Sequence, residues 1–314
     1  MLKKKIMKGP LFYAKILLFG EYGIIKDSKG LAIPYNAYRG ALKISENLSG
    51  KSLDSNANLE RFYTYLSSLK TDLVNFDLAA FKKDIQNGMY FDSSIPQGYG
   101  VGSSGALVAS IYDEYASDKI TVLENLTRDK LLNLKAVFAL MESFFHGKSS
   151  GLDPLNSYLS LPILINSKNS IEPAGIPSQK EGKGAVFLLD SEQIGETEPM
   201  VNIFMNKMKN EGFRKMISEE FSTTTDACIE DFLQGNVKSL FGNVKSLSKI
   251  VLTNFKPMIP DAFHKVWEKG ISTNEYYLKL CGSGGGGYIL GFTEDFVKAQ
   301  KSLKDYKLEL VYRF

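Results

Sequence analysis

Apolar and polar residues follow different periods along the chain, and the changes of period divide it into predicted strands and helices. Residues 11–45 are rich in apolar and aromatic residues on both sides of a turn signal at 27–30, which predicts two strands. Helical spacing follows at 56–70 and 78–88, with Gly88 placed to end the second helix. The chain is therefore expected to open with a sheet and to continue with helices.

A glycine-rich segment interrupts this pattern at residues 95–110, with the sequence IPQGYGVGSSGALVAS. Residues 89–95 before it predict a strand, and residues 105–116 predict a helix that leaves it. The strongest helical pattern follows at 127–146, where apolar residues recur at i, i+3, i+4 and i+7 and Gly147 stands at the C-cap position. The local order is thus strand, glycine loop and helix, followed by a long amphipathic helix.

The C-terminal half predicts a strand at 185–191, mainly helix between about 200 and 270, and two apolar segments around a second glycine run at 276–292. The pentapeptide NVKSL occurs twice in the helical region and places four apolar residues at heptad-like positions: Val237, Leu240, Val244 and Leu247. Two heptads are too few for a coiled coil, so we expect a helix that faces the core.

Because helices and strands occur in both halves, the pattern predicts an α+β fold with two domains. The polar segment 177–184 is a candidate linker. We place the boundary inside it, which gives an N-terminal domain of residues 1–178 and a C-terminal domain of residues 179–314.

Composition and charge narrow the class of partner. The 314 residues are 44% hydrophobic and 23% charged, as in a folded globular protein. Lys and Arg number 38 against 35 Asp and Glu, and no long basic stretch suits a nucleic-acid backbone. The apolar run at 159–165 is far shorter than the roughly 20 residues of a membrane helix. We therefore expect a small-molecule partner, no nucleic acid and no membrane, and the sequence leaves a homodimer open.

The N-terminus and the cysteines favour a cytoplasmic protein. A basic start precedes an apolar stretch, but Pro10 and Lys15 interrupt it and no small-x-small cleavage site follows, so a cleaved signal peptide is not expected. Cys228 and Cys281 lie far apart and match neither a disulfide framework nor a zinc ligand set. A reducing, cytoplasmic setting fits both observations.

Residues 100–105 match G-x-G-x-x-G, a pattern with several meanings. A dinucleotide site would need an acid about 20 residues later, and the candidate Glu124 lies in a weakly strand-like segment. A P-loop reading of GKSS at 147–150 is excluded because Glu142 replaces its first glycine. A glycine loop before a helix N-terminus suits a phosphate group, with a flexible turn as the alternative.

Three charged residues stand in unusual settings. Glu142 lies inside an apolar helical stripe. An acid at such a position is explained either by a buried ion pair or by a role as a metal ligand. His146 lies one turn further on, and no histidine-based metal cluster is visible. Lys15 interrupts an apolar strand, either extending out of the core or facing an anionic site. Asp153 is a turn or cap residue unless it pairs with Lys15, which would keep the carboxylate ionised and orient it toward a substrate hydroxyl.

Four segments occur in order along the chain: Lys15 with FGEYGIIK, PQGYGVGSSGA, HGKSSGLD and KLCGSGGGGYIL. Together they resemble the signature motifs of the galactokinase, homoserine kinase, mevalonate kinase and phosphomevalonate kinase (GHMP) superfamily, over essentially the whole chain. The opening KILLFGEY and the His-Gly before the third segment look most similar to the mevalonate kinases. The resemblance implies an N-terminal domain like domain 2 of ribosomal protein S5, a C-terminal ferredoxin-like domain, and Mg²⁺-ATP-dependent phosphorylation of mevalonate to 5-phosphomevalonate in isoprenoid biosynthesis.

The resemblance also implies roles for individual residues. Asp153 and Lys15 would be catalytic, Asp153 by handling the proton of the acceptor hydroxyl and Lys15 by neutralising charge. Ser104 and Glu142 would bind Mg²⁺, and Glu142 stands eleven residues before Asp153, as in mevalonate kinases. The implied ATP-binding residues are Pro96, Gly98, Gly100, Gly102, Ser103, Ser104, Gly105 and Ala106. The implied acceptor-binding residues are Glu21, Tyr22, His146, Gly282 and Ser283, and the glycine run that contains Gly282 would pack beside the phosphate loop.

The chain departs from the mevalonate kinase pattern at five positions. Tyr22 replaces a His, Gly105 an Ala, Ser149 a Pro, Pro154 an Asn and Cys281 a Thr. None of these removes a group that phosphoryl transfer requires, so the departures bear on the acceptor. Phosphomevalonate kinases often have Tyr at the position of Tyr22, which makes phosphomevalonate kinase or another GHMP kinase of sugars or alcohols the alternative. A nicotinamide-dependent oxidoreductase and a catalytically silent nucleotide-binding module are the alternatives from other classes.

Overall fold

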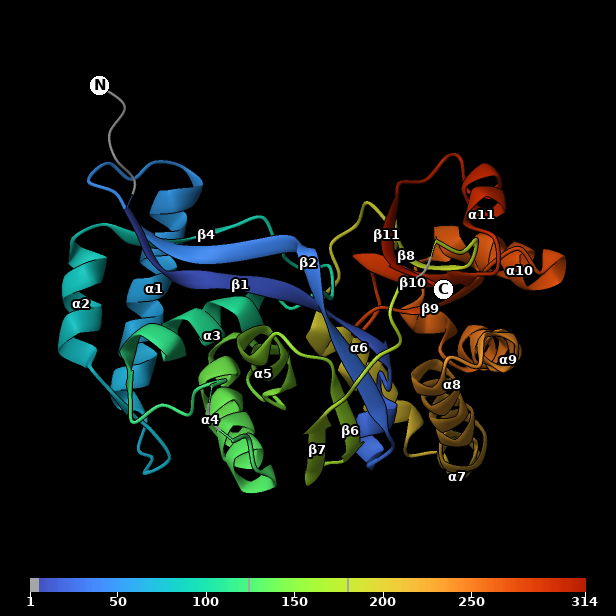
Figure 1. Ribbon diagram of the computed structural model, residues 1–314, viewed down its shortest axis with the longest axis horizontal. Coiled ribbons are helices and arrows are strands. Elements are labelled where there is room, and N and C mark those ends of the chain that lie inside the picture. The colour runs from blue at the N-terminus through green and yellow to red at the C-terminus, as the bar shows by residue number, and fades with distance from the viewer. Residues whose placement is uncertain (1–5, 124, 180) are drawn as a thin grey trace. The chain divides into compact units, whose positions relative to one another are not determined.

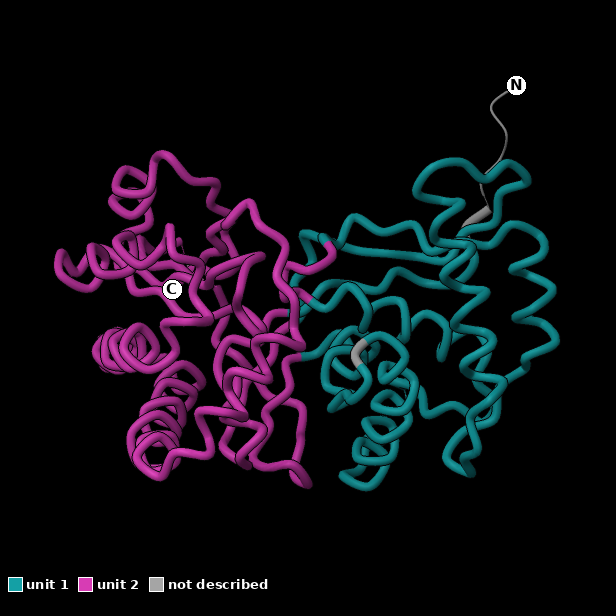
Figure 2. Tube along the Cα trace, turned by 180° about the vertical axis from the view of Figure 1, so that it is seen from behind, with its two compact units in different colours: residues 1–15, 34–96, 102–161 teal, residues 16–33, 97–101, 162–314 magenta. Residues whose placement is uncertain are grey.

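The computed structural model describes residues 6–123, 125–179 and 181–314 (Figure 1). The chain divides into two compact units, coloured separately in Figure 2. Unit 1 comprises Met1–Lys15, Pro34–Pro96 and Gly102–Leu161, and unit 2 comprises Ile16–Ile33, Gln97–Val101 and Pro162–Phe314. Residue 178 therefore lies inside unit 2, and the continuous domains 1–178 and 179–314 stay a prediction.

Two long strands contribute residues to both units, β1 (Ile6–Phe19) and β2 (Gly30–Ile44), joined through a short 3-10 helix, Gly23–Lys26. The remaining elements of unit 1 are α1 (Lys51–Ser68), β3 (Asn75–Phe76), α2 (Leu78–Gln86), β4 (Met89–Ser93), α3 (Ser103–Tyr115), β5 (Ala116–Ser117), α4 (Arg128–His146) and α5 (Leu152–Leu159). The predicted strands and helices of this half are confirmed, including the helix end at Gly88.

In the view of Figure 1, α3, α4 and α5 lie beneath the strands of unit 1, and α1 packs against β4. β2 pairs with β4 antiparallel, from Gly40 with Ser93 to Ile44 with Met89. Three rings join α3, α4 and α5: Tyr112 lies 5.0 Å from Phe138 and 5.2 Å from Tyr158, centre to centre. Such aromatic pairs contribute about 0.5–1.5 kcal/mol each beyond their buried area. These contacts fix the three helices that carry Ser104, Glu142 and Asp153.

The longest segment of unit 2, Pro162–Phe314, follows α5. Its elements are β6 (Ile163–Ser167), β7 (Ser170–Pro173), β8 (Ala185–Asp190), α6 (Thr197–Lys207), α7 (Glu211–Met216), a π-helical turn Ile217–Phe221, α8 (Ser222–Gln234), α9 (Val237–Asn254), two 3-10 turns at Lys256–Met258 and Asp261–Phe263, α10 (His264–Thr273), β9 (Tyr277–Leu280), β10 (Tyr288–Thr293), α11 (Phe296–Ser302) and β11 (Leu308–Arg313).

A four-stranded sheet, with its strands in the order β11-β8-β10-β9, forms the core of unit 2. Its pairings are antiparallel, and α9 and α10 pack against β9. The repeated NVKSL motif faces this core as predicted at Leu240, Val244 and Leu247, which are buried. Val237 is 37% exposed, because it is the first residue of α9 and precedes the packed turns.

Several elements lack a clear sequence signal. The α5 helix is only eight residues long and contains Pro154 in its first turn, so its sequence looked like a turn. The β6–β7 hairpin and the C-terminal α11 and β11 are also short. The mixed helix and sheet architecture confirms the predicted α+β class, whereas the names of the two domain folds stay predictions.

The strand pairings argue against a dinucleotide fold. A dinucleotide-binding turn opens a βαβ unit of a parallel sheet. Here α3, which leaves the glycine loop, runs into β5, and β5 pairs antiparallel with β3. The β2–β6 and β6–β7 pairings are antiparallel as well.

Two further findings concern the membrane and the cysteines. Among the described helices, none combines the length and apolar character that crossing a bilayer requires. Both cysteines, Cys228 and Cys281, are buried and free, and burial raises the pKa of the Cys228 thiol.

Candidate active site

A buried lysine and a half-buried carboxylate meet in unit 1. Lys15 lies in β1, where it is 4% exposed, and its Nζ is 2.9 Å from Oδ1 of Asp153. The Asp153 side chain keeps 38% of its surface exposed. The pairing of Lys15 with Asp153 that the sequence left open is therefore present, and part of the Asp153 side chain remains accessible to solvent.

Helix α5 sets the position of Asp153. Gly151 is the N-cap of this helix in the left-handed conformation, with φ 72°, and Asp153 lies in the first turn, where the helix dipole favours a negative charge. Helix α3 approaches this turn closely at Gly105, because a Cβ there would lie 2.7 Å from the carbonyl carbon of Asp153. Glycine at position 105 therefore allows the N-terminal part of α3 to pack against the turn that carries Asp153.

The N-terminus of α3 lies beside Lys15. Gly102 is its N-cap with φ 79°, and a Cβ there would lie 2.9 Å from Cγ of Lys15. As a glycine, this N-cap residue has no side chain to cap the helix, and the described first turn of α3 contains no acidic residue. The backbone N–H groups of a helix start and the adjacent cation together favour an anion such as a phosphate.

Glu142, on α4, is the second carboxylate of this region and is 3% exposed. Its Oε1 accepts a hydrogen bond from Ser104 Oγ at 3.1 Å, and its Oε2 accepts one from Ser149 Oγ at 2.5 Å. Burial, followed by the charge of Asp153, raises the pKa of Glu142 to about 7, although the two serines and Lys15 act in the opposite direction. A buried carboxylate of this kind is a group that a bound cation would stabilise.

The oxygen donors of this region fit a magnesium ion. Mg²⁺ prefers oxygen ligands and is usually held by one or two carboxylates together with waters and substrate phosphates. Glu142 and Ser104 already face each other, and the charges of Glu142 and Asp153 interact. Within the described residues, no group of three or more His, Cys, Asp or Glu could hold a metal ion. Glu142 and Ser104 are oxygen donors of the kind that could bind a Mg²⁺ ion together with waters and substrate phosphates.

The first part of the glycine loop belongs to unit 2, where it packs on the second glycine run. A Cβ on Gly100 would lie 2.5 Å from the carbonyl oxygen of Cys281, and one on Gly287 would lie 2.5 Å from Cα of Tyr99. Tyr288 also donates its backbone N–H to the carbonyl of Tyr99. The two glycine segments thus lie backbone to backbone, which confirms the predicted packing.

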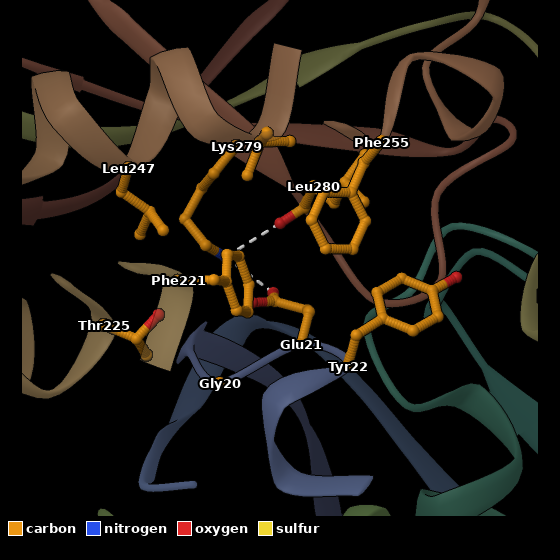
Figure 3. Close-up of a pocket in the computed structure, with 10 residues that line it drawn as sticks. Gly20, Glu21, Tyr22, Phe221, Thr225, Leu247, Phe255, Lys279 and Leu280 are labelled. Carbon is orange, nitrogen blue, oxygen red and sulfur yellow. Dashed lines mark hydrogen bonds and ion pairs between the residues drawn. The ribbon is translucent and has the colours of Figure 1, made fainter. Parts of the chain in front are cut away.

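A second buried ion pair lies in unit 2. Lys279 Nζ, in β9, is 2.6 Å from Oε1 of Glu21 and donates to the carbonyl of Leu280 at 2.8 Å. Figure 3 shows the Lys279 and Glu21 side chains pointing toward each other in a small cavity, with Thr225 beside them. The cavity volume of about 10 Å³ is close to what one water molecule needs.

Tyr22 lies at the edge of the same cavity. It is 5% exposed, its ring centre is 4.7 Å from that of Phe204, and its hydroxyl donates to the carbonyl of Ser283 at 2.6 Å. Burial, followed by the charge of Glu21, raises the pKa of this hydroxyl. The structure therefore brings together Glu21, Tyr22 and Ser283 of the predicted acceptor residues.

Other predicted site residues have different surroundings. Ser103 is half-buried in the first turn of α3, and Pro96 is half-buried before the loop. Ala106 is fully buried, because α3 turns it toward the core. His146 ends α4, but its side chain lies outside the described part of the structure, as does the whole of Glu124.

Sequence reasoning missed Lys279 and Ser149 as parts of these clusters. Lys279 carried the signal that pointed to Lys15, a cation within an apolar strand, here in YLKLC. In the sequence Ser149 differs from the family pattern only by standing in place of a frequent Pro, and its hydrogen bond with Glu142 depends on the fold of the 147–151 turn.

No protein-family model and no curated protein matches this chain. Solved structures do match it along nearly the whole length. A mevalonate kinase from L. major, in complex with R-mevalonate, has a TM-score of 0.66 at 14% identity and covers 99% of this chain and 98% of its own. A Streptococcus pneumoniae phosphomevalonate kinase has a TM-score of 0.60 at 16% identity and covers 98% of each chain. A Lactococcus lactis galactokinase complexed with galactose has a TM-score of 0.60 at 12% identity, with 96% of this chain and 92% of that one covered.

The chain has the GHMP kinase fold. Three members with different acceptors in their names match this chain over more than nine-tenths of its length, which no single-domain likeness would produce. The resemblance inferred from the four segments is thereby confirmed at the level of the fold. Because the GHMP kinase fold is shared by enzymes named for different acceptors, it does not by itself identify the acceptor of this chain.

Proposed function

We propose that this protein is an ATP-dependent small-molecule kinase that phosphorylates the primary hydroxyl of mevalonate. The observation that carries the proposal is the Lys15–Asp153 pair at 2.9 Å, next to the N-terminus of α3 and with 38% of the Asp153 side chain exposed. Phosphoryl transfer needs alignment and charge neutralisation more than covalent chemistry by the protein. A base, a cation and a set of backbone N–H groups supply these needs.

In this proposal Asp153 receives the proton of the acceptor hydroxyl. As that O–H bond breaks, the hydroxyl oxygen forms a bond to the γ-phosphorus of ATP. The bond from the γ-phosphorus to the β–γ bridging oxygen breaks, and its electron pair leaves with ADP. Lys15 holds the Asp153 carboxylate in position and balances negative charge on the moving phosphoryl group.

The backbone of the glycine loop binds the nucleotide in this proposal. The N–H groups at Ser103, Ser104 and Gly105 start α3 and would donate to phosphate oxygens. Ser104 and Glu142 would hold Mg²⁺, which neutralises phosphate charge when it is bound. Pro96, Gly98, Gly100, Gly102 and Ala106 complete the segment that we assign to ATP.

The choice of mevalonate rests on likeness to the mevalonate kinase segments and on the fold shared with the L. major enzyme. Phosphomevalonate is the second candidate, because Tyr22 stands where the mevalonate kinase pattern has a His. We assign Glu21, Tyr22, His146, Gly282 and Ser283 to the acceptor side. The cytoplasmic setting and the place in isoprenoid biosynthesis belong to the same proposal.

Release of ADP with a panel of acceptors tests the proposal. Purified protein is incubated with ATP and mevalonate, phosphomevalonate, galactose or homoserine, each with and without Mg²⁺. We expect Mg²⁺-dependent release with mevalonate and little with the other three acceptors. Release with phosphomevalonate alone would show that the acceptor is phosphomevalonate and not mevalonate, while the assignment as a kinase would stand. Tight NADH binding without ATP turnover on any alcohol would overturn the kinase itself.

A further inference from the structure

The Ser149 hydroxyl bonds on two sides within the turn that joins α4 to α5. It donates to Oε2 of Glu142 at 2.5 Å and accepts the backbone N–H of Gly151 at 3.0 Å. A hydroxyl has one proton to donate, so the bond from the Gly151 N–H leaves that proton for the carboxylate. Ser149 therefore connects the buried Glu142 to the N-cap of the helix that carries Asp153.

We propose that Ser149 is a positioning residue for the metal-binding carboxylate of Glu142, which fixes Oε2 so that Oε1 faces Ser104. This inference rests on the proposed kinase function and adds a residue to which neither the motif resemblance nor the comparisons gave a role. It concerns only side chains of unit 1.

The geometry supports a positioning role over simple packing. A carboxylate can rotate about its last side-chain bond, and that torsion is broad. The Oε1 and Oε2 bonds go to Ser104 and Ser149 on opposite ends of the group, so the two serines together fix its plane. If Ser104 turned toward a bound metal, the hydrogen bond from Ser149 would still hold Glu142. Partners that orient a metal ligand typically contribute 10–100-fold to metal affinity.

A neighbouring serine provides the matched control. Ser143 follows Glu142 on α4, is half-buried, and donates its hydroxyl to the carbonyl of Ala139 at 2.7 Å. This bond stays within one helix. Loss of the Ser143 hydroxyl therefore removes a serine of similar burial from the same region without changing the hydrogen bonds of Glu142.

The experiment compares four variants with the wild-type protein: Ser149→Ala, Ser149→Pro, Ser149→Thr and Ser143→Ala. Each is saturated with AMPPNP and titrated with Mn²⁺ while free Mn²⁺ is followed by electron paramagnetic resonance. AMPPNP affinity without metal and the melting temperature are measured alongside. Turnover is recorded over a range of Mg²⁺ concentrations.

We expect Ser149→Ala and Ser149→Pro to bind Mn²⁺ about tenfold or more weakly, because neither offers a donor to Glu142. Ser149→Thr should keep near wild-type affinity, since its hydroxyl can make the same bonds. AMPPNP affinity without metal should change less than about twofold, and excess Mg²⁺ should restore most of the turnover, a rescue that a folding defect would not show.

Three outcomes separate the claims. Weaker metal binding in the Ala and Pro variants, with Ser143→Ala unchanged, supports the inference. Equal Mn²⁺ affinity in Ser149→Ala, Ser149→Pro and Ser143→Ala overturns it and leaves the kinase intact. A wild-type protein that binds neither AMPPNP nor Mn²⁺ overturns the proposed function, and this inference fails with it.

Discussion

Two buried lysines pair with carboxylates in this protein, and the two pairs differ in what surrounds the acid. In unit 1 the side chains of Lys15 and Asp153 are 5% and 38% exposed. In unit 2 the side chains of Lys279 and Glu21 are 5% and 6% exposed. Both lysines interrupt apolar strands, so the sequence around them looks alike. The exposure of the acid distinguishes the pairs.

Under the proposed function, this difference distinguishes the pair whose carboxylate is open to a substrate from the pair whose two charges are both buried. Lys279 donates to Glu21 and to the carbonyl of Leu280, inside a cavity with room for about one water. Asp153 lies in the first turn of α5 and keeps an open side toward solvent. In the proposed function an acceptor hydroxyl would approach the exposed part of Asp153, whereas an acceptor that bound Glu21 would compete with Lys279 for that carboxylate.

The largest effect is expected from Asp153→Asn. The amide cannot take up the acceptor proton, so turnover should fall by about 10³-fold or more while ATP affinity changes only a few-fold. Steady-state kinetics and nucleotide binding on the same preparation check this. Turnover within about tenfold of wild type would remove Asp153 from the role of base.

The two lysines should differ in their effect on stability. Lys279→Met leaves Glu21 buried without its cation, which typically costs about 3–5 kcal/mol. Lys15→Met leaves Asp153 partly hydrated, so a loss below about 1 kcal/mol is expected. Urea unfolding of both variants measures the difference, and the double variant Glu21→Gln/Lys279→Met should recover part of the loss. Equal free energies of unfolding for the two single variants would contradict the distinction between the pairs.

Glu142→Gln should stabilise the protein in a pH-dependent way. Burial raises the pKa of Glu142 from 4.5 to about 7, so its protonated form is favoured in the folded state. The protonated Glu142 therefore stabilises the folded state fully below about pH 4.5. This stabilisation is lost as the pH rises through 7, where the buried carboxyl ionises. The neutral Gln avoids this loss, and we expect it to be about 1–3 kcal/mol more stable than wild type at pH 8.

Unfolding at pH 5 and pH 8 without nucleotide or metal measures this effect. The advantage of Gln should shrink toward zero at pH 5, because the wild-type carboxyl is then mostly protonated in the folded state. Identical differences at the two pH values would show that Glu142 does not titrate in this range.

The smallest effect concerns the contact between Gly102 and Lys15. Gly102→Ala adds a Cβ 2.9 Å from Cγ of Lys15 at a positive φ, and Gly147→Ala adds one at a positive φ with nothing within 4 Å. In both variants the free energy of unfolding should fall by about 1 kcal/mol, because alanine is unfavourable at a positive φ. Only Gly102→Ala should also lower turnover, by about tenfold, because it displaces Lys15 from Asp153. Equal turnover in both variants would show that Lys15 tolerates displacement.

The sequence predicted most elements of the fold because long amphipathic and apolar segments carry strong periodic signals. The helix at 127–146 and its glycine cap correspond to α4 (Arg128–His146). The α5 helix was missed because it is short, begins at a left-handed glycine and contains Pro154. Its formation depends on packing against α3 and α4, which no local pattern encodes.

The site was predictable where it rests on motif residues and less so where it rests on packing. Lys15 stood out as a cation in an apolar strand, and Glu142 as an acid in an apolar helical stripe. Their partners could not be read from local sequence, since Lys15 and Asp153 are 138 positions apart and Ser104 and Glu142 are 38 apart. Lys279 is, like Lys15, a cation within an apolar strand and could have been found by that signal. Its partner Glu21 is assigned to acceptor binding by the resemblance, which does not point to a pairing with Lys279.

Single-turnover phosphoryl transfer from γ-labelled ATP to mevalonate by the wild-type, Lys15→Met and Lys279→Met proteins tests most directly whether the Lys15–Asp153 pair is the reaction centre. Rates are normalised to the folded fraction of each protein under the assay conditions. We predict a loss of about 100-fold or more for Lys15→Met, whereas folded Lys279→Met should transfer within about tenfold of wild type. Equal loss of the transfer rate in both variants, or no transfer by the wild-type protein, would contradict the claim that the Lys15–Asp153 pair is the reaction centre.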